Sequence, residues 1–216
     1  MKLTEKELYA QLDELIARYP ILKGVGGDIM ASYLILQNIY ENGGKLLIAG
    51  NGGSAADAEH IAGELMKRFR KPRPVTEEFV KDLVHVDAKR GRSLAKNLEC
   101  SLMAIPLVAH EALTTAYIND VDGLGVFAQQ LFGYGTNRDV FLAISTSGNS
   151  ENILNAAVVA KALDMKVIGL TGKTGGELAH FADVGVKVPE TETYKIQELH
   201  LPIYHWWCMM LEEYFF

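Results

Sequence analysis

Two parts of the chain combine small, polar and titratable residues in spacings that suit chemistry on a ligand. In the first, NGGSAADAEHIAGE, a glycine-rich turn leads into a helical pattern that carries His60 and Glu64 four residues apart. This spacing places both side chains on one helix face, which suits either a metal site or a general acid paired with a base. A solvent-exposed pair worth roughly 0.2–0.5 kcal/mol has the same spacing. The nearby glycine-rich turn favours the chemical interpretation.

That turn follows an apolar run, KLLIAG, which ends at Gly50. Free backbone N–H groups at the start of a helix attract anions, and glycines let a ligand approach closely. A plain turn capped by a serine explains the segment equally well. A dinucleotide fingerprint does not, because G-x-G-x-x-G would require a glycine at Ala55, so we expect no nucleotide cofactor. The turn consists of Asn51, Gly52, Gly53 and Ser54.

The second part, ISTSGNSENIL, places four hydroxyl side chains directly before another helical pattern. Hydroxyls and backbone N–H groups at a helix N-terminus can together bind a phosphate. A helix cap needs only one hydroxyl, so this cluster favours a phosphate site made by Ser145, Thr146, Ser147 and Ser150. The later run LTGKTGGE superficially suggests a P-loop, but that motif would require a glycine at Val167.

A C-terminal helical pattern, residues 192–214, carries Gln197 and His205 eight residues apart. They lie about 80° apart around an ideal helix and so share one broad face, although Pro202 between them is expected to kink the helix. Local sequence alone favours His205 as a core histidine beside two tryptophans.

The remaining periodicity predicts the elements that must position these residues. Short apolar runs, typical of strands buried on both faces, alternate with helical patterns. We predict an α/β fold: a doubly wound, mostly parallel sheet of five strands with helices on both faces. The expected strands are residues 45–50, 101–109, 139–145, 166–172 and 183–189, and the helices between or after them are 54–69, 123–132, 150–163 and 192–214. Ligands bind at the carboxyl ends of such strands, where both polar clusters lie.

Three features are set apart from this alternation. Two amphipathic or apolar helices are expected at 5–19 and 28–44, the second stopped by Gly43-Gly44. They pack either within the chain or against a partner, and we expect residues 1–44 to mediate oligomerisation because of their apolar surface. Residues 70–100 are polar and form either a helical insertion or a mobile flap. Residues 1–216 are expected to be one domain.

Composition excludes several classes of protein. The chain has 216 residues, of which 49% are hydrophobic, and a net charge of −6. It is therefore neither a disordered chain nor a membrane-spanning one, since it has no long apolar run, and its acidic balance argues against direct binding of nucleic acid. Only Cys100 and Cys208 are present and the N-terminus has no apolar signal region, so we expect a reducing cytoplasm.

Together, the segments AGNGGSAADAEHIAGELMKRF, IND, ISTSGNSENIL and KIQELHLPIYHWWCMMLEE resemble the sugar isomerase (SIS) domain family. Within it, their order and spacing resemble the phosphoheptose isomerases, which interconvert sedoheptulose 7-phosphate and D-glycero-D-manno-heptose 7-phosphate. The resemblance covers most of residues 28–215 and implies a flavodoxin-like sandwich, an enediolate intermediate and a homotetramer. The insertion at 70–100 departs from the family pattern and could contribute to the rim of the pocket, which puts the exact phosphosugar in doubt.

The resemblance also implies a role for each matching residue. The hydroxyl cluster at 145–150 would hold the sugar phosphate, and Asn51, Gly52, Gly53, Ser54, Asn119, Asp120, Glu64 and Gln197 would contact the sugar. Zinc would be bound by His60, Glu64, Gln197 and His205, with Glu64 and His205 also the acid and base. The alternatives are a non-catalytic SIS protein that binds a phosphosugar or a replication initiator, and an isomerase of another phosphosugar.

Overall fold

The computed structural model describes residues 4–216 and is built around a parallel five-stranded sheet. The strand order is β2-β1-β3-β4-β5, and every neighbouring pair is parallel. The predicted α/β fold and all five predicted strands are confirmed. The strands are β1 (Leu46–Ala49), β2 (Ala104–Pro106), β3 (Val140–Ser145), β4 (Lys166–Thr171) and β5 (Val184–Lys187).

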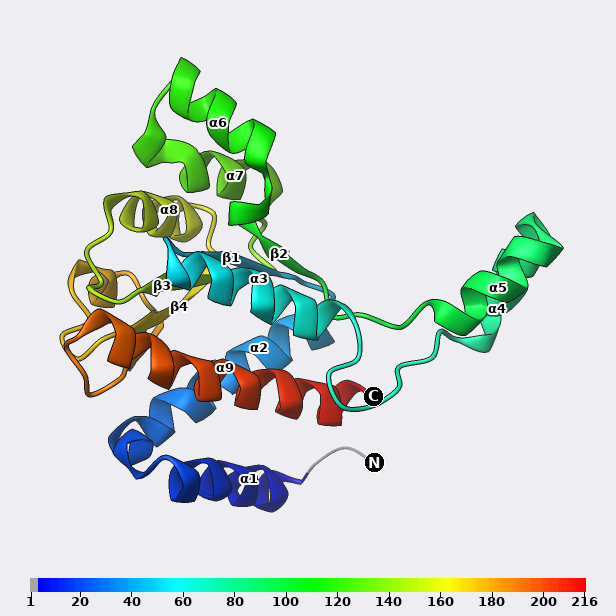
Figure 1. Cartoon of the computed structure of the whole chain (residues 1–216), viewed down its shortest axis with the longest axis horizontal. Coiled ribbons are helices and arrows are strands. Elements are labelled where there is room, and N and C mark those ends of the chain that lie inside the picture. Colours follow the sequence, from blue (N-terminus) through cyan, green and yellow to red (C-terminus); the bar gives the residue numbers. More distant parts are fainter. Residues whose placement is uncertain (1–3) are drawn as a thin grey trace.

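Helices cover both faces of the sheet, as Figure 1 shows, and each face has its own apolar core. Successive residues of β1 and β3 point to opposite cores: Ile48 and Leu142 into one, Leu47 and Phe141 into the other. The first core is covered by α1 (Glu5–Arg18), α2 (Gly26–Glu41), α3 (Gly53–Met66) and α9 (Thr193–Phe215). The second is covered by α7 (Val126–Tyr134) and α8 (Glu151–Ala162), with α6 (Glu111–Asp120) outside them.

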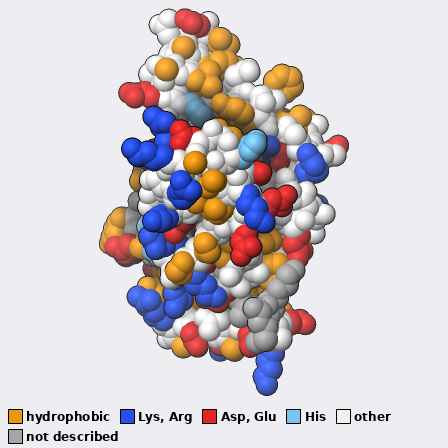
Figure 2. All heavy atoms as spheres, turned by 90° about the vertical axis from the view of Figure 1, so that its right-hand side faces the viewer, with side chains coloured by type: hydrophobic (Ala, Val, Ile, Leu, Met, Phe, Trp, Pro, Cys, Tyr) orange, Lys and Arg blue, Asp and Glu red, His pale blue; other side chains and the backbone are white. Residues whose placement is uncertain are grey.

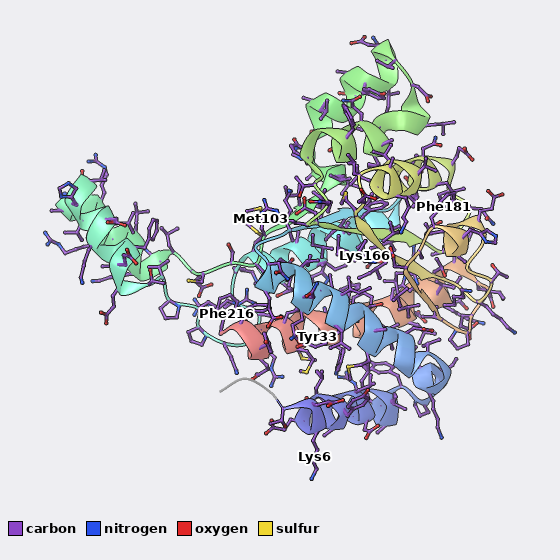
Figure 3. All side chains as sticks on the ribbon, turned by 180° about the vertical axis from the view of Figure 1, so that it is seen from behind. Lys6, Tyr33, Met103, Lys166, Phe181 and Phe216 are labelled. Atoms are coloured by element: carbon purple, nitrogen blue, oxygen red, sulfur yellow. The ribbon has the colours of Figure 1, made fainter. Side chains whose placement is uncertain are left out.

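The apolar N-terminal helices pack mainly within the chain. Tyr33 of α2 meets Trp206 of α9 edge-to-face, with ring centroids 5.6 Å apart, and the Trp207 indole donates a hydrogen bond to the Ile29 carbonyl at 2.9 Å. Figure 3 shows Tyr33 on the α2 surface that faces the rest of the molecule. Helix α2 ends at Glu41 and the chain turns at Gly43, where φ is +70°, in agreement with the predicted stop. Residues 1–3 of the predicted N-terminal region lie outside the described residues.

The 70–100 segment is helical over most of its length, as one of the two alternatives left by the sequence predicts. Helices α4 (Glu77–Val86) and α5 (Ala88–Asn97) form a hairpin, called the arm below, that stands away from the rest of the chain in Figures 1 and 3. Asp87 ends α4 and also caps α5, because its carboxylate accepts hydrogen bonds from the Lys89 and Arg90 N–H groups. The arm connects the end of α3 to the start of β2. It therefore lies on the side of the sheet where the strands begin, opposite the carboxyl ends of the strands.

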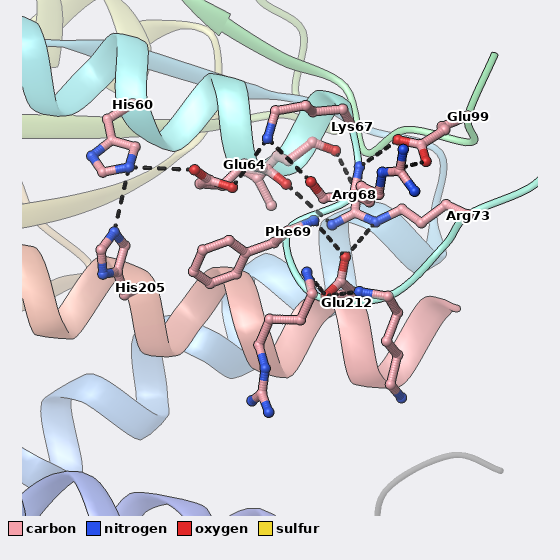
Figure 4. A network of polar contacts seen from close by, with 12 residues as sticks. His60, Glu64, Lys67, Arg68, Phe69, Arg73, Glu99, His205 and Glu212 are labelled. Carbon is pink, nitrogen blue, oxygen red and sulfur yellow. Dashed lines mark hydrogen bonds and ion pairs between the residues drawn. The ribbon is translucent and has the colours of Figure 1, made fainter. Parts of the chain in front are cut away.

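A buried ion pair fixes the base of the arm. The Arg73 guanidinium is fully buried and donates to the Glu212 carboxylate of α9 at 2.8 Å and to the Leu65 carbonyl at 2.8 Å. Glu212 also accepts hydrogen bonds from the backbone N–H groups of residues 69, 70 and 71 at 2.7 to 3.1 Å. Figure 4 shows this network directly after α3. The buried Arg73 guanidinium and Glu212 carboxylate, which are removed from water, therefore both have hydrogen-bond partners.

Among the described residues, no helix is long and apolar enough to cross a membrane. Exposed large apolar side chains gather in two places, on the arm and around α6 and α7. The second set, visible at the top of Figure 2, comprises Leu113, Ile118, Val121, Leu124 and Phe132.

The pKa of Glu212 makes its contribution to stability depend on pH. Burial raises this pKa, but the hydrogen bonds from the Phe69 and Arg70 N–H groups and from Arg73 outweigh burial, so the pKa lies below its usual value of 4.5. A carboxyl with a lowered pKa stabilises the fold above its unfolded pKa, and this stabilisation is lost as the pH falls through the folded pKa.

We therefore predict that Glu212→Gln lowers the free energy of unfolding by about 3–5 kcal/mol at pH 7, the usual cost of breaking a buried ion pair. Urea unfolding at pH 7 and at successively lower pH measures this difference, which should shrink as the pH falls below the ordinary carboxyl range. Glu213→Gln is the matched control, because Glu213 is only half-buried. Equal stability of the two variants would contradict the assignment.

Candidate active site

The carboxyl ends of β1 and β3 form one polar surface. Asn51, just after β1, exchanges two hydrogen bonds with Asn152 in the first turn of α8, each 2.9 Å long. The Gln197 side chain lies directly over the turn, because a Cβ on Gly53 would lie only 2.5 Å from its amide nitrogen. Ser54 is buried, whereas residues 51–53 remain exposed. The two loops that the sequence singled out are thus joined side by side.

The hydroxyl cluster forms a closed loop between β3 and α8. The Ser145 and Ser150 hydroxyl oxygens lie 3.0 Å apart, and the Gly148 N–H donates to Ser145 at 3.1 Å. Ser150 precedes α8, and its hydroxyl bonds to Ser145 instead of capping the helix. Ser147 is exposed and Thr146 is half-buried. The first-turn N–H groups of α8 and two hydroxyls therefore face the same surface.

The glycine-rich run after β4 supports this loop. Gly148 has a φ of +71°, and a Cβ there would lie 2.0 Å from the Gly175 carbonyl oxygen. Backbone hydrogen bonds join Gly172 N–H to the Thr146 carbonyl at 3.0 Å and Leu178 N–H to the Gly148 carbonyl at 2.9 Å. LTGKTGGE therefore shapes the neighbouring loop, a role that the sequence reasoning missed and that its three nearby glycines could have indicated.

His60, Glu64 and His205 come together between α3 and α9 (Figure 4). The His60 Nε2 atom lies 3.3 Å from a Glu64 carboxylate oxygen and 3.4 Å from His205 Nε2. The Glu64 side chain is 15% exposed and that of His60 is 42% exposed, so the carboxylate is the more sheltered member of the pair. Burial, together with His60, lowers the pKa of His205, so that its ring is neutral near pH 7. The group combines a carboxylate with two imidazoles that can accept or pass on a proton.

A chain of hydrogen bonds orients His60 from behind. Tyr204 donates its hydroxyl proton to Asp57 at 3.0 Å, and His60 Nδ1 lies 3.1 Å from the same hydroxyl oxygen. Burial and the neighbouring Asp57 keep the pKa of Tyr204 well above its usual value, so the phenol stays protonated. Because its proton points to Asp57, its oxygen accepts from His60 Nδ1–H. This contact turns the His60 Nε2 atom toward Glu64 and His205. Tyr204 escaped the sequence reasoning, although it directly precedes His205.

The donor set satisfies part of the geometry that a zinc ion requires. Tetrahedral zinc, with bonds of about 2.0–2.1 Å to nitrogen, places neighbouring ligand atoms about 3.3–3.4 Å apart. The two distances at His60 Nε2 match this value. Within residues 4–216, however, no group of three or more His, Cys, Asp and Glu side chains is arranged so that it could hold a metal ion. His60, Glu64 and His205 instead lie in a chain, with His60 in the middle.

Three other predicted site residues lie apart from this group. The Gln197 amide lies over Gly53 at the start of α3, two helical turns from His60. Asn119 and Asp120 end α6, where both are exposed and joined to each other by a hydrogen bond of 2.7 Å. The structure therefore brings Gln197 to the β1 turn, and it leaves Asn119 and Asp120 on the outer helix.

Comparison with known proteins agrees on one family. The model of the SIS domain family matches residues 88–172. The phosphoheptose isomerase of Aneurinibacillus thermoaerophilus is 40% identical over 81% of this chain and 75% of its own length. Phosphoheptose isomerase 1 of Campylobacter jejuni is 35% identical over 100% of both chains. The solved phosphoheptose isomerase of Neisseria gonorrhoeae superposes with a TM-score of 0.73 at 31% identity, covering 96% of this chain and 98% of that one.

The orientation of His60 leads to a prediction about its protonation. In the wild type at neutral pH, the His60 ring should carry its proton on Nδ1, because Tyr204 accepts that hydrogen bond. Tyr204→Phe should remove the preference, since Nε2–H is the commoner form of a free imidazole. Nitrogen-15 NMR of the histidine rings distinguishes the two tautomers. An unchanged His60 spectrum in Tyr204→Phe would contradict the proposed hydrogen-bond direction.

Proposed function

The chain belongs to the phosphoheptose isomerase family and is an isomerase; we propose that it interconverts sedoheptulose 7-phosphate and D-glycero-D-manno-heptose 7-phosphate. The observation that carries the proposal is that Glu64 and His205 both lie beside His60. This group lies two turns along α3 from the turn after β1, which Asn51 joins by hydrogen bonds to the first turn of α8, next to the hydroxyl cluster. A scaffold protein would need no such arrangement, so it favours a catalyst over a non-catalytic SIS protein.

The hydroxyl cluster is proposed to hold the phosphate. Ser147 and Thr146 offer hydroxyls, and the α8 N-terminus offers backbone N–H groups with the positive end of the helix dipole. Gly52, Gly53, Ser54 and Asn51 would line the sugar, together with Gln197, whose amide already lies over the turn. Asn119 and Asp120 are proposed to contact the sugar as well. Holding the distant phosphate positions the reacting carbons without taking part in the chemistry.

Glu64 is proposed as the base. Moving a carbonyl between C1 and C2 requires removal of a proton from the carbon beside it, which gives a cis-enediolate. Return of that proton to the neighbouring carbon completes the reaction, so one carboxylate can serve both steps. His205, neutral near pH 7, is proposed to carry a proton between the two substrate oxygens. Its lowered pKa suits this role, because a neutral ring can accept a proton and then release it.

A zinc ion is proposed at His60, Glu64 and His205. Gln197, the fourth ligand implied by the resemblance, lies over Gly53 and would have to turn toward His60 to join them. When bound, zinc would act as a Lewis acid toward the substrate oxygens. The distances from His60 Nε2 to Glu64 and to His205, and the Tyr204 contact that orients the His60 ring, support this assignment.

Metal analysis of tag-free protein tests the zinc proposal. We expect about one zinc per chain in the wild type and strong loss in His60→Ala, because each ligand contributes to affinity. His85→Ala is the control, since His85 lies exposed on the arm. Wild-type protein that binds no divalent ion would remove zinc while leaving the acid and base roles in place.

A pair of substitutions separates chemistry from binding. Glu64→Gln should lower turnover by at least ~10²-fold, the lower end of acid–base contributions, with a much smaller change in substrate binding. Ser147→Ala should raise KM roughly tenfold or more, as expected for losing a hydrogen bond to a charged group, with kcat little changed. Steady-state kinetics measure both, and the zinc content of Glu64→Gln must be determined alongside. Near-normal turnover in metal-loaded Glu64→Gln would show that Glu64 is not the base, and His205 would then be the first candidate.

The chain is proposed to act in the cytoplasm as a homotetramer. The apolar side chains of α2 are largely covered within the chain, which leaves only Tyr9, Ile21 and Leu34 exposed among the large apolar side chains of residues 4–44. The apolar set around α6 and α7 is the larger uncovered surface of the domain body, and α6 itself consists of exposed and half-buried residues. Subunit contacts over α6 and α7 would cover it, and they are proposed in addition to the contacts expected of residues 1–44.

Light scattering at micromolar concentration tests the assembly. We expect a mass of four chains, because related SIS proteins assemble in this way and the exposed apolar side chains at α6 and α7 need a cover. Phe132→Glu, at a residue that is 69% exposed in one chain, should reduce that mass, whereas Glu111→Lys on α6 should not. A wild type with the mass of one chain would overturn the proposal.

A further inference from the structure

The arm lacks a core of its own. Throughout residues 77–97, all of them described, Gly91 is the only buried residue. Phe79, Val86 and Leu94 are 45%, 84% and 44% exposed. They border a groove of about 270 Å³ that runs between the two helices. Helices of ten residues are marginal in water without tertiary packing, so this apolar face requires a cover.

The rest of the chain does not provide that cover. Among the described elements, the only extensive packing partner of α4 is α5, and the reverse also holds. Gly91 lets the helices cross closely, because a Cβ there would lie 2.3 Å from the Leu83 carbonyl oxygen. The Arg73–Glu212 pair and the Arg68–Glu99 pair, with nitrogen–oxygen distances of 2.8 and 3.1 Å, hold the base of the arm. The base therefore directs the arm away from its own domain, as Figure 1 shows.

The charges of the arm indicate which partner it fits. Helix α4 carries three carboxylates and one lysine, whereas α5 carries four cations and no carboxylate. Figure 2 looks toward the arm and shows apolar side chains between charged ones. A nucleic acid would meet the carboxylates of α4, and a uniformly acidic or basic protein would be repelled by one of the helices. A second arm is complementary, because its basic helix can lie beside the first arm's acidic helix.

We propose that the arms of two copies of this chain pair into a four-helix bundle. Each α4 lies beside the partner's α5, with a two-fold axis along the bundle, so that all neighbouring helices are antiparallel. Phe79, Leu83, Val86 and Leu94 of both copies then form the core that one arm lacks. The two-fold axis makes the contact close on itself, so pairing links two chains and stops there.

Val86→Asp tests the pairing in the full-length protein. Val86 is 84% exposed in one chain, so the substitution leaves the hairpin itself unchanged, but it would place a charge in the proposed core. Hydrogen exchange of the amides at 77–97 should accelerate at least ~10-fold, because burying an unpaired charge is costly. His85→Asp is the matched control, because His85 is exposed and does not line the groove, and it should change these rates little. Wild-type arm amides that exchange as fast as those of Val86→Asp would overturn the proposal.

A charge exchange identifies the partner as a second copy. One variant carries Glu77→Lys, Glu78→Lys and Asp82→Lys, which makes both helices basic. The other carries Lys89→Glu, Arg92→Glu and Lys96→Glu, which leaves the arm predominantly acidic. Each variant alone should show fast exchange at 77–97, and co-expression of both should restore protection, although repulsion within each arm persists. Co-expressed variants that exchange as fast as either alone would overturn pairing between copies and leave another partner.

Discussion

Helices α3 and α9 run in the same direction against each other, and their contacts set three separate properties of the molecule. At their beginnings, Gln197 lies against Gly53 and shapes the turn after β1. In the middle, His60 meets His205 and brings two imidazoles beside a carboxylate. Just beyond α3, Glu212 accepts three backbone N–H groups and the Arg73 guanidinium. The turn after β1, the His60–Glu64–His205 group and the base of the arm therefore share one helix pair, and a shift of α9 along α3 would alter all three.

Local sequence patterns predicted the sheet because its central strands β1, β3 and β4 are short apolar runs buried on both faces. The same patterns missed α6, whose residues are exposed or half-buried and so carry weak periodicity. They also counted residues 70–100 as uniformly polar. Arg73 is nevertheless among the most buried residues. Its carboxylate partner, Glu212, lies 139 positions away in the chain. Contacts of that range cannot be read from spacing, which is why the insertion remained either helical or mobile.

The candidate site was predictable where its chemistry lies on one element. His60 and Glu64 share a face of α3, and the four hydroxyl residues of the cluster all lie within the short segment 145–150. Its long-range supports were not predictable: Gly175 meets Gly148 through a close backbone approach, and Tyr204 reaches His60 from another helix. Local sequence favoured His205 as a core residue. It becomes a candidate acid or base only because the packing of α9 on α3 places it beside His60. The likeness to a family supplied that pairing before the fold did.

The position of α9 in the chain has a consequence for the order of events during synthesis. The ribosome makes α9 after every strand and every other helix, yet this helix completes the core against α2 and α3. Until it emerges, the nascent chain exposes Ile29, Tyr33 and Ile61, and Arg73 has no carboxylate to pair with. A domain arranged in this way cannot mature stepwise from its N-terminus. Its first face stays open to chaperones and to neighbouring nascent chains until the final helix closes it.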